Sequence, residues 1–261
     1  ELSIGGQRID KHYQKWWRMY SELYLDETKK ANWAKMTTAP SSTVYLPLIF
    51  FFNRNPGLYL PLIALQYHEV RVDIDLASDF TTYLSSLKVW ANYIYLDTEE
   101  RRRFAQKGHE YLIEQVQHTG VDTVTGYTSA QNVRLSYNHP VKELVWCLSN
   151  TASASSLWNF TEDTTNIVVE SNVTAISESN TFVPTSFSGA PLLSVGAAGS
   201  TVAFTEEAVG PLDTFKLVLN GQDRFKEQDG KYFNQVQAFN HHTGCPYPGV
   251  YSYSFALKPE E

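Results

Sequence analysis

Residues 1–10 read ELSIGGQRID, and residues 215–225 read FKLVLNGQDRF. Both segments run from a short strand-like stretch through a turn-prone position into Gly-Gln, at an offset of 215 residues. A second pair of similar segments follows in the same order. VYLPLIFF at residues 44–51 resembles VYSYSFA, which begins 206 residues later. Two pairs of similar segments in the same order arise by chance much more rarely than one pair. The chain is therefore predicted to contain two similar β-domains in tandem.

The repeated residues are interpreted as one structural motif, a strand that leads into a tight turn. They are Gly5, Gly6 and Gln7 in the first copy, and Gly221 and Gln222 in the second. The chain opens inside the first copy with Glu rather than Met, and it stops just past another strand-like segment. This pattern predicts an internal piece of a longer protein, one that lacks both ends.

The composition narrows the class of protein. A length of 261 residues allows one large domain or two ordinary ones, and the 14% of aromatic residues favours pleated, half-buried surfaces. The formal net charge of −7 argues against a nucleic-acid-binding groove, which needs a basic surface. The two cysteines form neither a disulfide framework nor a zinc pattern, so a reduced intracellular setting is the default and one bridge stays open. The longest apolar run is too short to span a bilayer.

The first part of the chain predicts one amphipathic helix and several strands. Aromatic and apolar residues recur at helical spacing over residues 13–24, with Asp10 as the N-cap. Strands are predicted at residues 44–52, 70–76 and 88–96, and the middle one alternates most regularly.

The next part predicts a junction followed by a return to strands. A short helix over residues 97–104, capped by Asp97, is predicted to join the two domains. Strands are predicted after it at residues 111–118, 133–137 and 144–148.

The predicted domains are residues 1–108, which include the joining helix, and residues 109–261. The second contains a long segment, residues 150–211, that has no Lys or Arg and is rich in Ser, Thr, Ala and Gly. We expect this acidic segment to be a surface loop at the outer tip of the protein, because loops of this length are usually functional or disordered. The alternative is that it folds inward as extra strands of the core, for which residues 167–169 and 192–193 leave room. Its two glycosylation sequons, at Asn159 and Asn172, would then be exposed acceptors.

Four groups of side chains could carry chemistry, and each also has an ordinary structural explanation. They are a His-His-Cys group (His241, His242, Cys245), a carboxylate pair (Asp73, Asp75), a tryptophan pair (Trp16, Trp17) and an arginine run (residues 101–103). The His-His-Cys group does not have the spacing of a standard metal-ligand set, and the carboxylate pair has no partner acid or base nearby. The tryptophans fit helix-to-sheet packing, and the arginines fit a solvated or contacting helix. We therefore assign no catalytic, cofactor-binding or metal-ligating residue and expect no enzyme.

Several longer stretches carry a family resemblance in the right order along the chain. They are residues 4–13, 45–53, 56–57, 60–70, 96–101, 104–106, 219–225, 232–234 and 249–259. These stretches resemble the major capsid protein of large icosahedral DNA viruses of the algal-virus and iridovirus type. The resemblance runs nearly end to end, and only residues 150–211 lie outside it.

The resemblance implies an all-β fold, a tandem double jelly roll with short helices in the connections, in which each roll is partly truncated. It implies a structural protein of a viral shell, whose homotrimers form pseudo-hexagonal capsomers that tile an icosahedral capsid. The implied partners are further copies of the chain, minor capsid proteins and a nearby internal membrane, without a cofactor or direct nucleic-acid contact. The implied location is the virion, after assembly in the cytoplasm of the host cell.

Two other classes of protein stay open at this point. A carbohydrate-binding β-sandwich would use exposed loop aromatics such as Trp158 and Phe160, and a β-sandwich hydrolase would use an active site assembled in space. A sugar-binding protein predicts a saturable sugar titration, and a hydrolase predicts turnover that one substitution abolishes. A shell protein predicts trimers and larger arrays.

Overall fold

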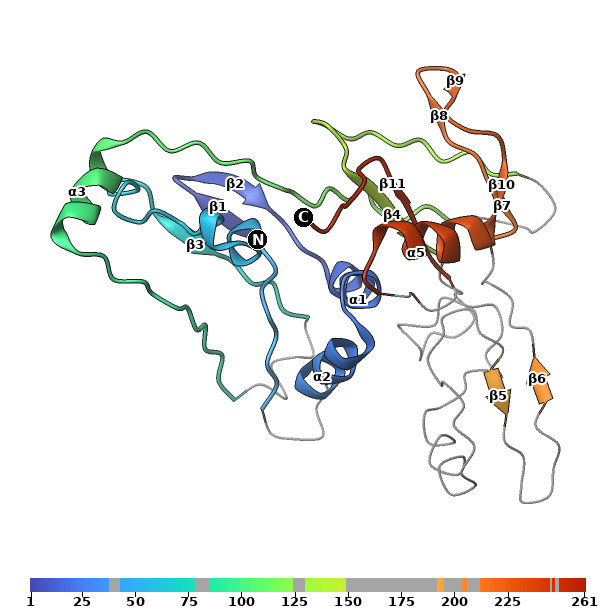
Figure 1. The fold of residues 1–261 in the computed structure, drawn as a ribbon, viewed down its shortest axis with the longest axis horizontal. Helices are drawn as coiled ribbons and strands as arrows, with labels where there is room; N and C mark the ends of the chain where they lie inside the picture. The colour runs from blue at the N-terminus through green and yellow to red at the C-terminus, as the bar shows by residue number, and fades with distance from the viewer. Residues whose placement is uncertain are drawn as a thin grey trace. The chain divides into compact units, whose positions relative to one another are not determined.

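The computed structural model describes residues 1–37, 43–77, 85–123, 130–148, 212–244, 246 and 249–261, and the backbone of two short strands between residues 192 and 205. The chain forms two compact units, which interleave along the sequence (Figure 1). The first unit comprises Glu1–Tyr13 and Leu46–Tyr137, and the second comprises Gln14–Tyr45 and Asn138–Glu261. The domains predicted from the sequence are consecutive, and that division stays a prediction.

The first unit contains a three-stranded antiparallel sheet in the order β2-β1-β3. Its strands are β1 (Leu2–Ile4), β2 (Gln7–Asp10) and β3 (Val70–Val72). The strand predicted over residues 70–76 therefore ends at Val72, and the N-terminal strand β1 pairs with it along its length.

A two-residue turn joins β1 to β2. Gly5 and Gly6 both have positive φ, 60° and 80°, and Ile4 pairs with Gln7 across the turn. Positive φ at both central residues is the type I′ arrangement, whose twist matches that of the flanking strands, and glycine adopts it without steric cost. The first copy of the repeated motif is thus a tight β-hairpin.

The core of the first unit lies against this sheet. Leu2, Phe50 and Phe51 are buried together, and two short 3₁₀ turns follow, η1 (Phe51–Asn53) and η2 (Pro56–Leu58). The strand predicted over residues 44–52 is wrong: the segment is extended without a strand partner and then coils into η1. Pro47 removes a ladder donor from this segment, and the turn-forming residues after Phe52 end it.

Three further predicted strands of the first unit do not form. Residues 88–96, 111–118 and 133–137 belong to no strand in the structure. Trp90 is 83% exposed and Tyr95 is 93% exposed, so no described segment covers this apolar surface. Alternation of side chains marks a segment that suits a sheet, but a strand forms only where a second segment supplies backbone hydrogen bonds.

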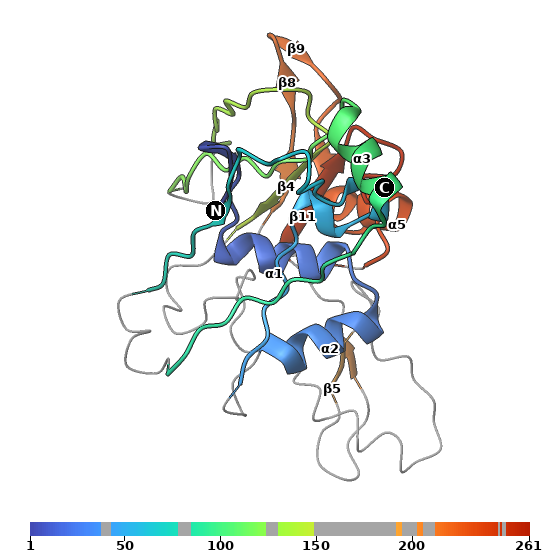
Figure 2. The same ribbon diagram turned by 90° about the vertical axis from the view of Figure 1, so that its left-hand side faces the viewer.

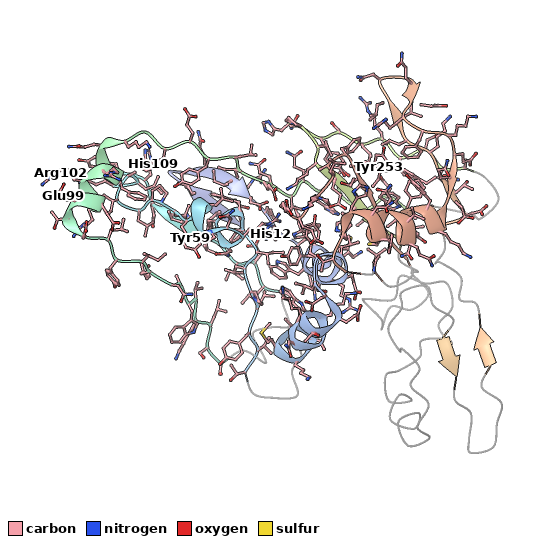
Figure 3. The ribbon with its side chains drawn as sticks, in the orientation of Figure 1. His12, Tyr59, Glu99, Arg102, His109 and Tyr253 are labelled. Atoms are coloured by element: carbon pink, nitrogen blue, oxygen red, sulfur yellow. The ribbon has the colours of Figure 1, made fainter. Side chains whose placement is uncertain are left out.

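The helix predicted over residues 97–104 is present and lies within the first unit, and its role as a joint between two domains stays a prediction. It is α3 (Thr98–Gln106), and the carboxylate of Asp97 accepts a hydrogen bond from the backbone N–H of Glu100 at 2.9 Å, which is the expected N-cap. On its exposed surface, Arg102 pairs with Glu99 at 2.9 Å (Figure 3). The arginine run is therefore on a solvated helix that is partly neutralised by its own glutamate.

The second unit begins with two helices, α1 (Gln14–Leu23) and α2 (Glu27–Thr37), which lie near each other in both ribbon views (Figures 1 and 2). The predicted amphipathic helix corresponds to α1, which buries Met19 and Leu23 against Ala238 and Val250. The prediction that Asp10 caps this helix is wrong. Asp10 ends β2, and its carboxylate accepts hydrogen bonds from backbone N–H groups of the first unit.

The centre of the second unit is one antiparallel strand pair. β4 (Glu143–Cys147) runs beside β11 (Val250–Ser254), with Val250 opposite Cys147 and Ser254 opposite Glu143. The predicted strand over residues 144–148 is therefore confirmed within one residue. A π-helical turn, η5 (Tyr232–Val236), continues into α5 (Gln237–His241), and both contact β11.

The remaining strands form short antiparallel pairs. They are β5 (Leu192–Ser194) with β6 (Ala203–Thr205), β7 (Thr214–Phe215) with β10 (Gln228–Asp229), and β8 (Val218–Leu219) with β9 (Gln222–Asp223). All the sheets in the described parts are antiparallel and the helices between them are short, in line with a β-rich class of fold.

Candidate functional site

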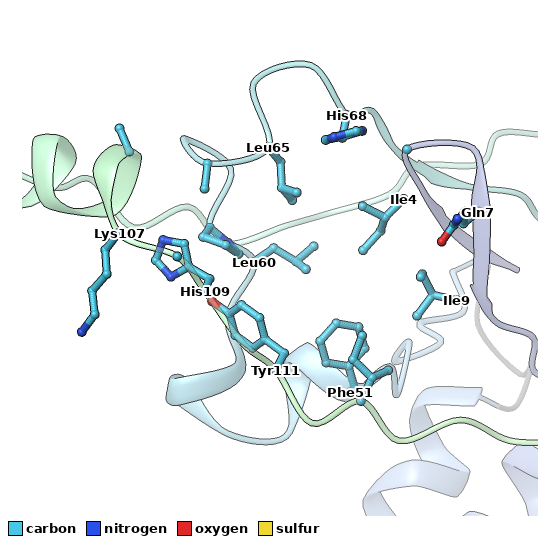
Figure 4. A pocket seen from close by; sticks show the side chains of 16 residues that line it. Ile4, Gln7, Ile9, Phe51, Leu60, Leu65, His68, Lys107, His109 and Tyr111 are labelled. Carbon is cyan, nitrogen blue, oxygen red and sulfur yellow. The ribbon is translucent and has the colours of Figure 1, made fainter. Parts of the chain in front are cut away.

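A groove of about 650 Å³ lies in the first unit (Figure 4). The hairpin β1–β2, the chain that follows η2 and the chain that follows α3 supply its walls. Its lining is apolar with a polar rim: Ile4, Gly5, Gln7, Ile9, Phe51, Leu60, Pro61, Ala64, Leu65, His68, Ala105, Lys107, Gly108, His109, Tyr111 and Ile113.

The groove offers a mostly apolar surface for packing. Its lining contains no carboxylate, serine or cysteine; the titratable side chains on its rim are His68, Lys107, His109 and Tyr111. Two of its polar side chains are engaged with the backbone: a ring nitrogen of His109 lies 2.8 Å from the carbonyl oxygen of Phe104, and the Tyr111 hydroxyl donates to the carbonyl of Tyr59 at 3.2 Å. The available chemistry is burial of apolar groups.

The two copies of the repeated motif form the same local structure. In the second unit, Asn220 and Gly221 have φ values of 51° and 79°, and Leu219 pairs with Gln222 across the turn. Gly6 and Gly221 thus occupy equivalent positions, as do Gln7 and Gln222. The first hairpin also lines the groove, where a Cβ on Gly5 would lie 2.6 Å from Nδ1 of His68.

A buried histidine–aspartate pair anchors the end of β2. Nε2 of His12 lies 2.8 Å from Oδ2 of Asp10, both side chains are 3% exposed, and the Phe50 ring stacks on the imidazole at 4.8 Å. The other oxygen of Asp10 accepts from the N–H groups of Lys11 at 2.8 Å and Val116 at 3.0 Å. One oxygen of the carboxylate holds the His12 ring and the other holds two backbone N–H groups, so both are engaged within the fold.

A second buried histidine lies in the second unit. His242 follows α5, its side chain is fully buried, and Nε2 is hydrogen-bonded to a carboxylate oxygen of Glu143 in β4. Nδ1 lies 3.5 Å from a carboxylate oxygen of Glu260. The hydroxyl of Tyr24 donates to the other oxygen of Glu143 at 2.7 Å. This cluster joins Glu143 to residues 119 positions before it and 99 positions after it in the chain, and no local spacing marks it.

The four groups singled out in the sequence prove to be separate structural features. Trp16 packs against the core that contains Met19 and Leu23, as expected for helix packing. Asp73 pairs with Arg71 at 2.8 Å on an exposed face. His241 and His242 contact different partners, and no group of three metal-ligating side chains forms among the described residues. Cys245, Asn159 and Asn172 lie outside the described residues.

Two side chains of the central strand pair, Tyr251 and Cys147, have raised pKa values. Burial raises the pKa of Tyr251 to about 12, although the Leu212 N–H that donates to its hydroxyl favours the ionised form. Burial also raises the pKa of the Cys147 thiol, partly offset by the charge of Lys15. Both shifts follow from position in a core, and a thiol with a raised pKa is a poor nucleophile at neutral pH.

The described helices are all too short or too polar to cross a bilayer.

Family models match most of the chain. One described as the N-terminus of a major capsid protein matches residues 1–97, and one described as a large eukaryotic DNA virus major capsid protein matches residues 100–261.

Individual proteins are also similar. The major capsid protein of Paramecium bursaria Chlorella virus 1 is 42% identical over 289 residues, covering 99% of this chain and 60% of that protein. The major capsid protein of Phaeocystis pouchetii virus is 33% identical over 361 residues, covering 100% of this chain and 69% of that protein. The chain thus spans well under the full length of both relatives.

Solved structures resemble the chain as well. A quasi-atomic model of the PBCV-1 virus capsid matches with a TM-score of 0.62 at 36% identity, covering 99% of this chain and 64% of that one. A crystal structure of PBCV-1 VP54, fitted into a reconstruction of the virophage Sputnik, matches with a TM-score of 0.63, covering 100% and 64%.

Proposed function

Because the chain belongs to the major capsid protein family of large eukaryotic DNA viruses, we propose that it is a structural component of a viral shell and acts by assembly, not by catalysis. The observation that carries this proposal is the family match over residues 1–97 and 100–261, which leaves almost none of the chain unexplained. The mostly apolar groove of the first unit, which offers a packing surface, supports the same role.

We propose that the whole protein folds as a tandem double jelly roll, with one roll in residues 1–108 and the other in residues 109–261. The equivalent hairpins at Gly5-Gly6 and Asn220-Gly221 support a repeated design, because corresponding strands of two similar rolls would turn at the same place. The unpaired, strand-like segment at residues 88–96 supports it too. Its exposed apolar side chains are suited to pairing with further strands of a larger sheet.

The proposed assembly is a homotrimer. Three copies with two jelly rolls each would give a pseudo-hexagonal capsomer, and such capsomers would tile an icosahedral capsid with minor capsid proteins between them, over an internal membrane. A heterologous contact that repeats around a threefold axis closes into a ring, which is a finite unit suited to tiling. The proposed location is the virion after assembly in the host cytoplasm. Direct contact with nucleic acid is not proposed, because the net charge is −7.

Residues 150–211 are proposed to lie on the outer tip of the capsomer. The segment carries no cation in its sequence, and like-charge repulsion between acidic tips would discourage capsids from adhering to each other. Its sequons at Asn159 and Asn172 are proposed as glycan acceptors on that surface. Limited proteolysis of intact particles tests the placement, since early cuts are expected inside this segment, and full protection there would contradict it.

The assembly is tested on the whole capsid protein by light scattering after size exclusion, combined with electron microscopy. We expect a mass of three copies and a near-hexagonal outline. A monomer at all concentrations would contradict the proposal. A monomer that also binds a sugar saturably would instead favour the carbohydrate-binding β-sandwich.

A further inference from the structure

The inference concerns the two edges of the central strand pair, β4 and β11. Along a strand, the backbone N–H and C=O groups of successive residues point to opposite edges. The N–H of Phe255, just past β11, donates to the carbonyl oxygen of Lys142 at 3.0 Å, on the side that faces β4. The backbone groups of Val250, Ser252 and Ser254 therefore point to the other edge, where no described strand lies beside β11.

Two amide side chains from the neighbouring helical segment take the place of a strand at this edge. Nδ2 of Asn234, in η5, donates to the carbonyl oxygen of Val250 at 2.8 Å. Oε1 of Gln237, in α5, accepts from the backbone N–H of Ser254 at 3.0 Å. Both bonds are buried, and they lie at the first and last residues of β11. The helical segment thus supplies one donor and one acceptor, the two kinds of group that a neighbouring strand would offer.

The amide of Gln237 is held in the orientation that its bond to β11 requires. Its Nε2 donates to the Tyr232 hydroxyl at 3.0 Å, which leaves Oε1 directed at Ser254. Asn234 and Gln237 are 0% and 4% exposed, and Ser252, between the two bonds, is 1% exposed. Water is therefore kept from the whole edge, and a backbone group left unpaired there would cost free energy.

The outer edge of β4 has no such cover among the described residues. The backbone groups of Glu143, Val145 and Cys147 point away from β11, and no described residue bonds to them. Both faces of the strand pair are covered. Val145 and Cys147 pack against the core that α1 buries, and Trp146 packs against the opposite core, which contains Phe233. A further strand can therefore join this pair only at an edge.

We propose that Asn234 and Gln237 are an edge-capping pair: their amides occupy the backbone groups of β11 that an incoming strand would need, so that strands join the pair at β4 and not at β11. An uncapped edge is a template for pairing with another chain. The partner expected at an uncapped β11 is β11 of a second copy, because two copies of one strand can pair antiparallel about a twofold axis. The inference goes beyond the proposed role in the shell and does not rest on it.

Hydrogen exchange of the whole capsid protein, resolved to single residues, tests the capping bond. Gln237→Met keeps the length of the side chain and removes its acceptor. In dilute solution, exchange at the N–H of Ser254 is expected to rise about tenfold, the size of change associated with losing one hydrogen bond. The N–H of Phe255, which is bonded to Lys142, should keep its protection. Unchanged exchange at Ser254 in the variant would overturn the proposal.

Sedimentation velocity over a range of concentrations tests the consequence for association. Gln237→Met is expected to form species of about twice the mass of the unmodified assembly as the concentration rises, while the unmodified protein keeps its mass. Protection at Ser254 should return in these species, because the incoming strand supplies a new acceptor. Loss of protection with no extra association, or association that leaves Ser254 unprotected, would count against the edge-capping pair.

The matched control is Gln235→Met. It is the same substitution in the same helical segment, at a half-buried residue that makes no hydrogen bond to β11. It is expected to match the unmodified protein in both measurements. Equal association by this control and by Gln237→Met would overturn the proposal.

A second variant covers the case in which Gln237→Met does not fold. Gln237→Asn keeps an amide on a shorter side chain, which withdraws the acceptor from Ser254, and the same two changes are expected. A folded variant that exposes Ser254 and keeps the mass of the unmodified protein contradicts the proposal. Each variant is compared with the unmodified protein, so the outcome does not depend on whether that protein is a trimer, which light scattering measures separately.

Discussion

The backbone N–H of Gly244 donates a hydrogen bond to the carbonyl oxygen of Leu23 at 2.8 Å. Leu23 is the last residue of α1, where helix carbonyls lack partners within the helix, so the loop after α5 supplies a donor that the helix cannot. The backbone at Gly244 lies very close to the end of α1. A Cβ at position 244 would lie 2.4 Å from the carbonyl oxygen of Glu22 and 2.7 Å from those of Leu23 and Leu25.

The substitution Gly244→Ala is therefore expected to lower the free energy of unfolding by about 2–3 kcal/mol, because the added methyl group meets rigid backbone. Urea denaturation followed by circular dichroism measures the change. Gly108→Ala is the control, since a Cβ there meets nothing within 4 Å, and its effect should stay within about 0.5 kcal/mol. Equal stabilities for the two variants would contradict this account of the loop.

A buried amide links η5 to the central strand pair. Asn234 is fully buried, and its Nδ2 donates to the carbonyl oxygen of Val250 at 2.8 Å. Asn234→Ala removes this donor inside the core and is expected to lower the free energy of unfolding by about 2 kcal/mol. The matched control, Asn240→Ala, changes the same residue type at an exposed position of α5 and should have little effect.

The two hairpin turns are expected to respond alike to substitution. Gly6 and Gly221 have φ values of 80° and 79° with open space at the Cβ position, so an alanine meets backbone strain and no clash. Each alanine variant should lose about 1 kcal/mol, the cost of holding an L-residue in the left-handed region. Gly57→Ala, where φ is not in that region and the nearest atom would be at 3.5 Å, is the comparison variant. Differential scanning calorimetry of the three variants measures the change in stability. Equal losses for Gly57→Ala and for the two turn variants would contradict the expectation.

The buried hydroxyl of Tyr251 is expected to lower the free energy of unfolding in strong alkali. Its pKa is raised by burial to about 12 from an ordinary value of 10.0, so the folded state keeps the phenolic proton longer than the unfolded chain does. Between pH 10 and pH 12 the folded state therefore binds more protons than the unfolded chain does. The contribution of Tyr251 to the free energy of unfolding is fully present below pH 10 and is lost as the pH rises toward 12.

Unfolding midpoints in urea at pH 9 and pH 11 measure this dependence. Tyr251→Phe removes the ionisable group and should show a smaller drop over the same interval, although it starts from lower stability because the Leu212 N–H loses its acceptor. An unchanged drop in the variant would assign the alkaline effect to other groups.

Apart from strand β4, whose partner β11 lies far along the chain, the elements that the sequence predicted correctly are those completed by nearby residues. Helix α3 has its cap residue Asp97 within one turn, and α1 shows its buried stripe over a few turns. The turn at Gly5-Gly6 needs only the two residues that adopt positive φ. Their hydrogen bonds and conformational preferences are local, so the order of residues is enough to indicate them.

Strands and the His242 cluster depended on contacts from elsewhere. The segments at residues 70–76 and 88–96 both have a strand pattern, but β1 supplies backbone partners only to Val70–Val72. In the same way, His242, Glu143 and Glu260 meet only because β4, α5 and the C-terminal segment pack together. The sequence by itself determined helices α1 and α3, the tight turns and the family, whereas α2 and α5 were not predicted. The tertiary structure decided which strands pair and which charges are buried together, because those interactions join residues that no local pattern connects.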